Sequence, residues 1–257
     1  MYQCNIIGYP LNKPRSLKIW KKHFRLKKIA SKMEPLEVKK KDLQFFFNKI
    51  KEDKNFLASA VTSPLKIPSF KFIIPGDLIS KKAGSINFII KKKKNFFGYN
   101  TDIISLIEII KKYKKKNILI IGLGGVGLAL AKVLSISKKF NVYALSSKKN
   151  FKINKIKIFK KFKDVNLDMI ELIINCTPLG SDLSKEFLNK TPISKYFFPK
   201  IKKYKIQILD IIYKPKKTLL HGLCKKFKIN YSNGIKMNSS QAKIALQKID
   251  YYLKRKK

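Results

Sequence analysis

The stretch KNILIIGLGGVGLALAKVL, residues 116–134, decides the fold of this 257-residue chain. Its apolar run NILII, residues 117–121, is of the kind that forms a strand buried on both faces of a sheet. Glycines crowd the next turn, and an apolar helix pattern then covers residues 126–134. The segment NVYALSS, residues 141–147, predicts the following strand. A strand, a glycine-rich turn, a helix and a strand in this order are typical of a Rossmann-type nucleotide-binding domain.

The glycines of this turn define a candidate phosphate site. Without a side chain, glycine lets the backbone approach a pyrophosphate closely, and the start of the helix supplies amides with a partial positive charge. We therefore expect cofactor contacts along the turn, at Gly122, Gly124, Gly125 and Val126. A tight structural turn without a ligand is the alternative.

The residues after the second strand bear on the choice between NADP and NAD. A carboxylate there would bind the ribose hydroxyls of NAD. The chain has Ser146, Ser147, Lys148 and Lys149 instead, and hydroxyls and cations suit the 2′-phosphate of NADP. NADP is therefore the predicted cofactor and NAD the alternative. The two lysines have a second interpretation, as background charge in a lysine-rich chain.

A later strand pattern, within ELIINCTPLG at residues 171–180, runs into a loop at its carboxyl end. Ligands of open α/β sheets bind outside that edge, so Thr177 and Cys176 are candidates to line the cofactor site. A free cysteine is more often a small buried residue, which is the alternative for Cys176.

Strand and helix patterns also alternate through the first part of the chain. Strands are expected at residues 3–8, 34–38 and 56–61, and helices at residues 16–26 and 42–50. This alternation indicates an α/β fold, and the length suits one large domain or two modest ones.

The formal net charge of +44 comes from 59 basic and 15 acidic residues. Such a balance often marks a nucleic-acid binder. Only three of the basic residues are arginines, however, and the lysines are spread along the chain without a basic tail. Abundant Ile, Asn, Phe and Tyr accompany them, so mutational bias in an AT-rich genome is the favoured explanation. We expect neither a nucleic-acid nor a membrane partner, since no apolar run reaches the length that spans a bilayer.

The cysteines Cys4, Cys176 and Cys224 are odd in number and far apart, and the two histidines do not cluster with them. We expect neither a metal site nor a disulfide framework from this spacing. The N-terminus resembles a strand with a glycine turn rather than a signal peptide, and a reducing cytoplasm is the expected location.

Five further segments form a constellation with the glycine-rich turn. In chain order they are AVTSPLK at residues 60–66, AGSIN at 83–87, GYNTD at 98–102, LDIIYKP at 209–215 and NGIKMNSSQA at 233–242. Together with the turn they resemble the shikimate dehydrogenase family (shikimate/quinate 5-dehydrogenase-like proteins). That family carries N-V-T-x-P-x-K, G-A-x-N-T, G-x-N-T-D, G-x-G-G-x-x-x-A, D-x-x-Y-x-P-x-x-T-x-L and G-x-x-M-x-x-x-Q-A in this order. The resemblance spans nearly the whole chain.

The resemblance implies a two-domain α/β enzyme with its active site in a cleft. Residues 1–103 with 236–257 would form the substrate-binding domain, and residues 104–235 the Rossmann-type NADP-binding domain. The implied reaction is the reversible NADPH-dependent reduction of 3-dehydroshikimate, a small anionic substrate, to shikimate in aromatic amino-acid biosynthesis. A monomer or a homodimer is expected.

The same resemblance implies a catalytic pair. Lys66 matches the family's catalytic lysine, which would act as general acid, or as base in the reverse direction. Asp102 matches the paired aspartate, which would hold the ammonium and bind a substrate hydroxyl. The alternative for Asp102 is a helix N-cap, because an apolar helix pattern follows it. The alternative for Lys66 is ordinary surface charge.

Other matched positions complete the implied site. Asn87 and Gln241 match amides that bind the ring hydroxyls, Ser16 matches a serine that binds the substrate carboxylate, and Thr62 is expected to face the same pocket. Tyr213 matches a tyrosine near that carboxylate, with a core or interface tyrosine as the alternative. Gly234 matches a glycine near the nicotinamide, with a turn as the alternative.

The chain also departs from the family's pattern. In GYPLNKPRSL, residues 8–17, Pro14 replaces the first of two serines and Lys13 replaces a histidine. Ala60 replaces the asparagine of the lysine motif, Phe88 replaces a threonine, and Ser147 stands where an arginine often binds the 2′-phosphate.

Three hypotheses follow from these departures. The first is a working shikimate dehydrogenase. The second is a related oxidoreductase with a shifted substrate such as quinate. The third is a non-catalytic basic descendant that binds a nucleotide or a nucleic acid. The intact Lys66 and Asp102 argue against the third, whereas Pro14 and Ala60 would support the second.

Overall fold

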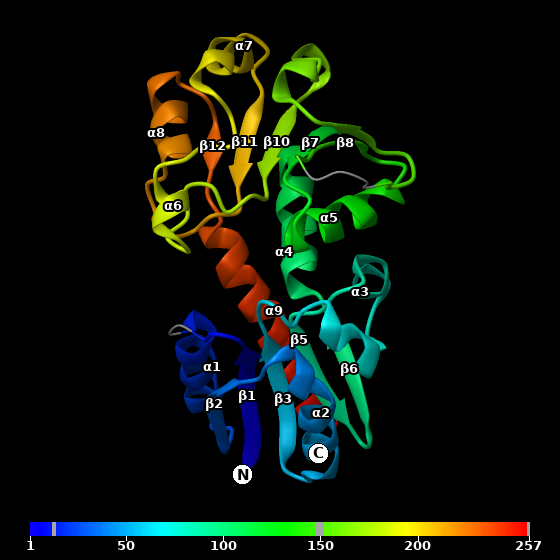
Figure 1. Ribbon diagram of the computed structural model, residues 1–257. Coiled ribbons are helices and arrows are strands. Elements are labelled where there is room, and N and C mark those ends of the chain that lie inside the picture. Colours follow the sequence, from blue (N-terminus) through cyan, green and yellow to red (C-terminus); the bar gives the residue numbers. More distant parts are fainter. Residues whose placement is uncertain (12–13, 148–151, 256–257) are drawn as a thin grey trace. The chain divides into compact units, whose positions relative to one another are not determined.

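The structure is a computed structural model that describes residues 1–11, 14–147 and 152–255. The chain divides into two compact units (Figure 1). The first unit is formed by Met1–Ser105 and Ser239–Lys257, and the second by Leu106–Asn238. Each unit is built around its own six-stranded sheet.

The sheet of the first unit is mixed. Its strands are β1 (Tyr2–Gly8), β2 (Ser31–Glu37), β3 (Phe56–Val61), β4 (Ile74–Pro75), β5 (Phe88–Lys92) and β6 (Asn95–Tyr99), in the order β2-β1-β3-β5-β6-β4. The strand β1 pairs in parallel with β2 and β3, whereas β5 runs antiparallel to β3 and β6. Every residue of β3 is buried, so this strand forms the centre of the unit.

Helices cover both faces of this sheet, because successive side chains of a strand point to opposite faces. Ile6 packs in one core cluster with Trp20 and Ile249, whereas its neighbour Ile7 packs in another cluster with Phe47. The helices behind these clusters are α1 (Arg15–Leu26) and α9 (Ile235–Lys254) on one face and α2 (Leu43–Glu52) on the other. The helices of the unit are α1 (Arg15–Leu26), α2 (Leu43–Glu52), α3 (Leu78–Ala83), the start of α4 (Thr101–Tyr113) and most of α9 (Ile235–Lys254), with 3₁₀ turns at Lys40–Asp42 and Pro68–Phe72.

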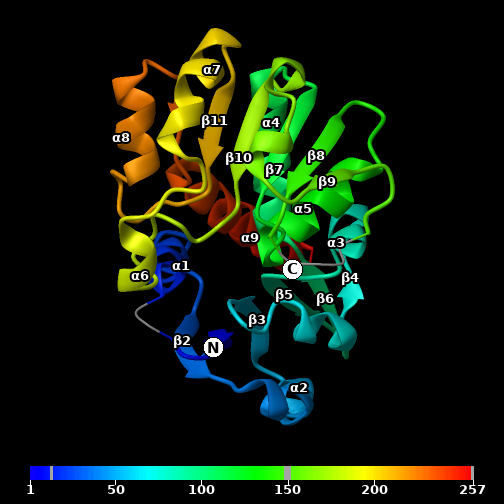
Figure 2. The same ribbon diagram turned by 45° about the horizontal axis from the view of Figure 1, so that its top comes forward.

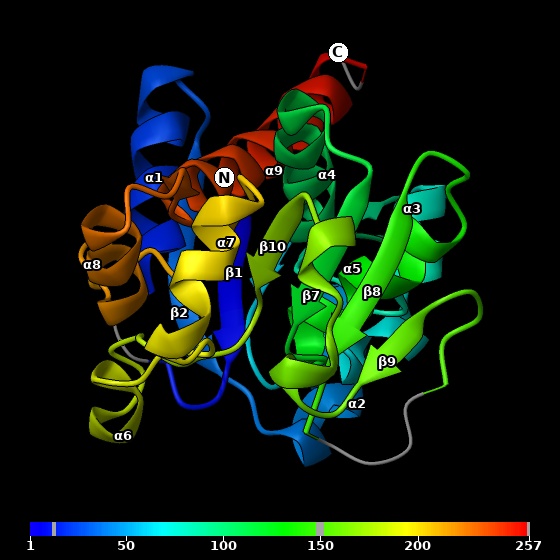
Figure 3. The same cartoon turned by 90° about the horizontal axis from the view of Figure 1, so that it is seen from above.

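The sheet of the second unit is parallel throughout. Its strands are β7 (Asn117–Ile121), β8 (Asn141–Leu145), β9 (Lys157–Phe159), β10 (Leu172–Asn175), β11 (Gln207–Asp210) and β12 (Tyr231–Ser232), in the order β12-β11-β10-β7-β8-β9. Figures 2 and 3 show β10, β7, β8 and β9 side by side. The chain runs outward from β7 to β9 and then returns to the other side of β7, so the strand order reverses there, which is where open α/β sheets bind ligands.

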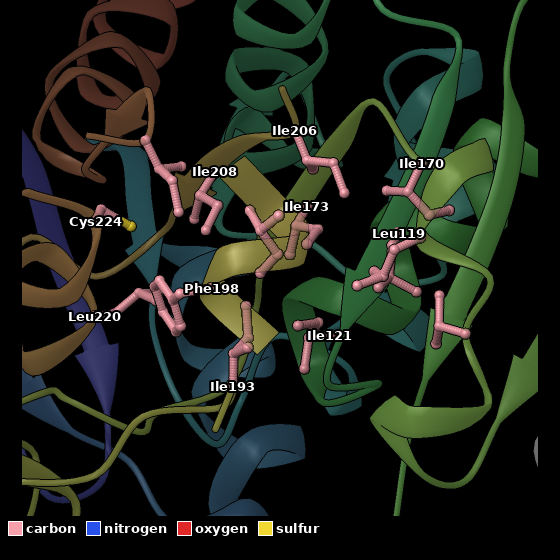
Figure 4. Close-up of a cluster of buried hydrophobic side chains, with 14 of the residues drawn as sticks. Leu119, Ile121, Ile170, Ile173, Ile193, Phe198, Ile206, Ile208, Leu220 and Cys224 are labelled. Atoms are coloured by element: carbon pink, nitrogen blue, oxygen red, sulfur yellow. The ribbon is translucent and has the colours of Figure 1, made fainter. Parts of the chain in front are cut away.

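The helices of this unit separate into two layers. The buried face of the sheet shown in Figure 4 carries Leu119, Ile173 and Ile208, which pack against Phe198 of α7 and Leu220 of α8. The buried residues of α5 lie outside this cluster, and α5 packs on β7 and β8 from the other face. The bounds are α5 (Gly125–Ser135), α6 (Lys185–Leu188), α7 (Phe198–Lys203) and α8 (Leu219–Lys226), with 3₁₀ turns at Phe162–Asp164, Leu167–Met169 and Lys195–Phe197.

The prediction of an α/β fold with a Rossmann-type unit is confirmed. Each strand and helix expected from the sequence overlaps an element of the same type, and the differences are at the ends. The strand expected from residue 34 already begins at Ser31, and the strand expected over residues 141–147 ends at Leu145. Ser146 and Ser147 therefore follow β8 rather than ending it. No helix in the described part of the chain has the length and apolar character needed to cross a membrane.

Candidate active site

The first unit contains the predicted catalytic pair as a direct ion pair. The Lys66 Nζ lies 2.7 Å from the Asp102 Oδ2, and the two side chains are 31% and 11% exposed. Lys66 is held through its neighbours: Leu65 is fully buried in the core, and the Lys66 carbonyl oxygen accepts a hydrogen bond from the Ile86 amide at 2.9 Å. A short bond with a charged donor and a charged acceptor in a partly desolvated place is one of the stronger polar contacts a protein makes.

Asp102 is not the N-cap of its helix. The Asn100 Oδ1 accepts from the Ile103 amide at 3.1 Å, which is the capping bond of α4. The Asn100 Nδ2 in turn donates to the Ser85 carbonyl oxygen and hydroxyl, both at 3.0 Å. The capping interpretation of Asp102 is therefore wrong. Asn100 caps α4, and the Asp102 carboxylate binds Lys66 instead.

The two predicted substrate amides lie together beside Thr101. The Asn87 Oδ1 accepts from the Thr101 amide at 2.7 Å and from its hydroxyl at 3.0 Å. A backbone N–H can only donate, so this bond fixes which end of the Asn87 amide is the oxygen. The Asn87 Nδ2 then donates to the Gln241 Oε1 at 3.3 Å, and the Thr101 hydroxyl lies 3.2 Å from the same oxygen. The Thr101 amide thus fixes the orientation of the Asn87 amide, and the Asn87 amide in turn fixes that of Gln241.

Sequence reasoning missed Thr101 as part of this site. It is fully buried between Asn100 and Asp102, in the GYNTD segment. Its place between two polar residues at the start of a helix was a signal for a local role. Its bonds to residues 14 and 140 positions away were not visible in the sequence.

The hydroxyls of Ser16 and Thr62 have no hydrogen-bond partner among the described residues, and both side chains are half-buried. Ser16 lies in the first turn of α1, after Pro14, which provides no side-chain cap. Thr62 follows β3, and its amide donates to the Ile7 carbonyl oxygen at 2.9 Å. Lys13 lies outside the described residues.

Two departures from the family's pattern are neighbours in space. Ala60 of β3 is the antiparallel partner of Phe88 of β5, and both side chains are buried in the cluster that contains Trp20. A small side chain opposite a large one preserves packing volume. The two departures therefore lie at paired positions of the same core cluster.

In the second unit, the glycine-rich turn has the shape that a phosphate group needs. Gly122 adopts a φ of +91°, and a Cβ there would lie 2.6 Å from the Thr177 Cγ2. A Cβ on Gly127 would collide with the Gly122 carbonyl oxygen. At Gly124 and Gly125, by contrast, a Cβ would meet no atom within 4 Å, so the backbone is open on that side.

The start of α5 has free donors beside this open backbone. Gly124 is the N-cap residue and provides no side-chain acceptor, so the first amides of the helix, including that of half-buried Val126, have no side-chain cap. Free amides at a helix N-terminus next to an unobstructed backbone fit a pyrophosphate.

The next two strand ends complete this edge of the sheet. Ser146 is buried, with its amide donating to the Phe159 carbonyl oxygen at 3.0 Å, and Ser147 is exposed. Lys148 and Lys149 lie outside the described residues. The Thr177 amide and hydroxyl both donate to the Asn175 Oδ1, at 2.9 and 2.7 Å. Cys176 is buried, and burial raises the pKa of its thiol far above the usual value, so it is a packing residue.

Tyr213 and Gly234 belong to neighbouring loops of the same unit. Tyr213 is half-buried in the loop after β11. The Gly234 amide donates to the Ile212 carbonyl oxygen at 2.9 Å, and a Cβ on Gly234 would collide with the Ile211 carbonyl oxygen. The close approach explains why glycine is needed at position 234. Within the residues that the structure describes, no three His, Cys, Asp or Glu side chains are placed to hold a metal ion.

Comparison with known proteins gives a consistent result. No family model matches the sequence. A protein of Methanosphaera stadtmanae named shikimate dehydrogenase (NADP(+)) is 30% identical over 242 residues, which cover 86% of this chain and 81% of that protein. A Clostridium botulinum protein of the same name is 26% identical over 258 residues, which cover 96% of this chain and 95% of that protein.

Solved structures show the same fold. A chorismate mutase/shikimate 5-dehydrogenase fusion protein from Clostridium acetobutylicum matches with a TM-score of 0.81 at 23% identity, covering 97% of this chain and 90% of that chain. The sequence relatives extend over both units, including the Lys66–Asp102 pair and the glycine-rich turn. On this basis the chain belongs to the shikimate dehydrogenase family.

Proposed function

We propose that this protein is an NADP-dependent shikimate dehydrogenase, which reversibly reduces 3-dehydroshikimate to shikimate. The observation that carries the proposal is the 2.7 Å Lys66–Asp102 pair, placed in one unit with the Asn87–Gln241 amides. The curated relatives, named for this activity and for NADP(+), agree with it. The activity places the enzyme in aromatic amino-acid biosynthesis.

Reduction of the ring ketone of 3-dehydroshikimate requires a proton at the ketone oxygen. NADPH, when bound, supplies the hydride. The Lys66 ammonium donates the proton to the developing alkoxide, and the neutral amine accepts it in the reverse direction. The Asp102 carboxylate holds the ammonium in place and accepts a hydrogen bond from a substrate hydroxyl. Because Asp102 is only 11% exposed, this contact is poorly screened by water.

Polar groups of the first unit would bind the rest of the substrate. With their oxygens turned toward Thr101 and Asn87, the Gln241 Nε2 and the second N–H of the Asn87 Nδ2 would donate to ring hydroxyls. The hydroxyls of Ser16 and Thr62, which have no partner within the part of the chain that the structure describes, suit the substrate carboxylate and its neighbouring hydroxyl. Tyr213 is assigned to the carboxylate on the resemblance alone.

The second unit would bind NADP. The backbone at Gly122, Gly124, Gly125 and Val126 receives the pyrophosphate, Thr177 lines the same edge, and Gly234 lies near the nicotinamide. Ser146, Ser147 and Lys148 are assigned to the 2′-phosphate. Because β8 and β9 end side by side at Leu145 and Phe159, Lys160 and Lys161 follow β9 at the same edge of the sheet as Ser146 and Ser147. This basic pair supplies cations at the edge where the arginine is missing.

The free, buried state of all three cysteines fits a reducing compartment, and we place the enzyme in the cytoplasm. A monomer or a homodimer remains the prediction for its oligomeric state.

Quinate is the second candidate substrate, because Pro14 removes one hydroxyl from the carboxylate site. Loss of one hydrogen bond to a charged group costs about 1.5–3 kcal/mol, which would weaken binding of the shikimate carboxylate. The pairing of Ala60 with Phe88 in the core removes the other argument for a shifted substrate.

The test is a comparison of four reactions: shikimate or quinate with NADP⁺ or NAD⁺, followed by absorbance at the wavelength of the reduced cofactor. We expect the highest kcat/KM for shikimate with NADP⁺. Faster turnover of quinate would favour a shifted substrate. The absence of turnover, together with a salt-sensitive shift of DNA or RNA, would favour a non-catalytic basic protein.

A further inference from the structure

A buried carboxylate in the second unit has no part in the function described above. Asp210, the last residue of β11, is fully buried. Its Oδ1 accepts from the Asn175 Nδ2 at 3.0 Å and from the Ile212 amide at 3.1 Å, and its Oδ2 accepts from the Tyr231 hydroxyl at 3.1 Å. Burying a charge is costly unless such donors surround it, so a buried carboxylate with three donors calls for an explanation.

The first donor leads to the cofactor edge. The Asn175 amide gives its nitrogen to Asp210 and its oxygen to the Thr177 amide and hydroxyl. Thr177 packs directly on the glycine-rich turn, where its Cγ2 would be 2.6 Å from a Cβ on Gly122. Asp210 therefore sets the position of Thr177 through a single side chain.

The second donor leads to two further loops. The Ile212 amide bound by Asp210 precedes Tyr213, and the Ile212 carbonyl oxygen accepts from the Gly234 amide at 2.9 Å. One peptide thus joins the loop of Tyr213 to the loop of Gly234. The third donor, Tyr231, comes from β12, and its hydroxyl lies 3.4 Å from that of Thr218, which caps α8.

An ionised carboxylate accepts from all three donors at once, and its charge strengthens each bond. A carboxylate accepts at both oxygens, whereas a protonated carboxyl or an amide presents a donor on one side. In that neutral form, at least one of the three bonds must be lost or reversed. The strength of the bonds that hold the three loops consequently depends on the charge of Asp210, a residue that the proposed function assigns to neither substrate nor cofactor.

We propose that Asp210 is a positioning residue for the reaction: its ionised carboxylate holds the loops of Thr177, Tyr213 and Gly234 in the single arrangement from which Thr177 and Gly234 contact NADP. This inference rests on the proposed function, which assigns those three residues to the site. Asp210 would act on the reaction only indirectly, through the residues that it holds in place.

The charge of Asp210 changes within an accessible pH range. Burial raises its pKa from 3.8 to about 6, although the bonds from Ile212, Asn175 and Tyr231 oppose the shift. The titratable groups that face it are Cys176 after β10, Cys224 of α8 and Tyr231 of β12, and burial raises the pKa of all three. His221 of α8 stacks on the Tyr231 ring with centroids 4.9 Å apart. The pH experiment must therefore separate the effect of His221 from that of Asp210.

The experiment measures the Kd of NADP⁺ by calorimetry on the full chain between pH 5 and pH 8, for the wild type and for Asp210→Asn. The 2′-phosphate itself titrates near pH 6, but its effect cancels in the ratio of the two Kd values. We expect the variant to bind about tenfold more weakly or worse at pH 8, as for the loss of a bond to a charged group. At pH 5, where the wild-type carboxyl is neutral too, the two Kd values should come within about twofold.

A ratio that is the same at both pH values, or a variant that binds like wild type at pH 8, overturns the proposal. Tyr231→Phe provides a second test if Asp210→Asn fails to fold. Removing a donor to the charged form raises the pKa of Asp210, so the midpoint of the wild-type pH profile should move to higher pH. His221→Gln should leave the midpoint unchanged. An unmoved midpoint in Tyr231→Phe, or a shift in His221→Gln, contradicts the role of Asp210. Wild-type protein that binds no NADP⁺ would instead refute the cofactor assignment of the proposed function.

Discussion

Lys66 is one of 59 basic residues, and its surroundings distinguish it from the others. Among the ion pairs of the described residues, Asp102 is the least exposed carboxylate, at 11%. The pair between Lys32 and Glu34, by contrast, has both side chains more than half exposed. Exposed pairs of that kind contribute little to stability. What distinguishes Lys66 in this lysine-rich chain is therefore that its partner, Asp102, is largely removed from water and held in place.

Asp210 makes a prediction about stability at the residue scale. Its pKa is raised on folding, so the stabilisation of the neutral form is complete below the unfolded value of 3.8 and is lost as the pH rises through about 6. About two pKa units correspond to about 3 kcal/mol.

Urea unfolding at pH 4 and pH 7.5 measures this effect as the difference in free energy of unfolding between wild type and Asp210→Asn. Wild type should lose about 3 kcal/mol relative to the variant between the two pH values. Self-repulsion of the lysines affects both proteins equally and cancels. A difference that does not change with pH would contradict a raised pKa. If the pKa of Asp210 is raised on folding, its carboxylate lowers the free energy of unfolding at neutral pH and also orders the cofactor edge. Such a trade-off between stability and function is common at functional sites.

At the scale of elements, opposite effects are expected for glycine-to-alanine changes at Gly127 of α5 and Gly222 of α8. In Gly127→Ala the new methyl group meets the backbone oxygen of Gly122, which cannot move without disturbing β7. We expect a loss of about 1–3 kcal/mol in the free energy of unfolding. The matched control is Gly222→Ala in α8, where a Cβ meets nothing within 4 Å.

The control should raise the free energy of unfolding by about 0.5–1 kcal/mol, because alanine favours a helix interior over glycine. Urea titrations of the two variants beside wild type provide the measurement. Equal effects at the two positions would show that the turn does not need the close approach of Gly127 to Gly122.

The ends of β8 and β9 predict the origin of the cofactor preference. Replacing both Lys160 and Lys161 by alanine removes cations beside Ser146 and Ser147, so the Kd of NADP⁺ should rise about tenfold or more, while that of NAD⁺ stays within about twofold. Changing both Lys138 and Lys139 to alanine removes the same charge before β8, at the opposite edge of the sheet. Calorimetry that finds equal losses in both double variants would attribute the effect to net charge alone.

How much of this could be predicted from the sequence depended on the range of the interactions. The turn from β7 to α5 is local, and its glycines, strand and helix were predicted within a residue or two. The end of β8 was predicted two residues late, because serine neither favours nor forbids the last position of a strand.

Interactions between distant residues were not predictable in this way. Thr101 reaches Gln241 across 140 positions, and Asp210 reaches Asn175 across 35. No local sequence pattern predicts such partners. The N-cap of α4 was predicted at Asp102 as an alternative, although Asn100 two residues earlier has an equally suitable side chain and takes that role.

For the molecule as a whole, the net charge of +44 predicts a strong dependence on salt. Both substrates are anions, so a positive field should speed their capture, and salt should weaken that effect. The same salt should stabilise the fold by screening repulsion between lysines. We expect kcat/KM to fall and the melting temperature to rise between about 20 mM and 300 mM NaCl.

Steady-state assays and thermal melts over this salt range check both directions. Potassium fluoride in place of NaCl controls for binding of chloride to the cofactor site. A kcat/KM that does not change with ionic strength would show that the lysines are too dispersed to focus a field on the site.

The central claim is that Lys66 carries the proton. The direct measurement is NADP⁺ reduction with shikimate by wild type, Lys66→Ala and the exposed-lysine control Lys82→Ala, with the Kd of NADP⁺ measured for each. We expect kcat to fall about 10²–10⁴-fold in Lys66→Ala alone, while the Kd of NADP⁺ stays within about twofold. A Lys66→Ala variant that retains kcat within about twofold of wild type would contradict it.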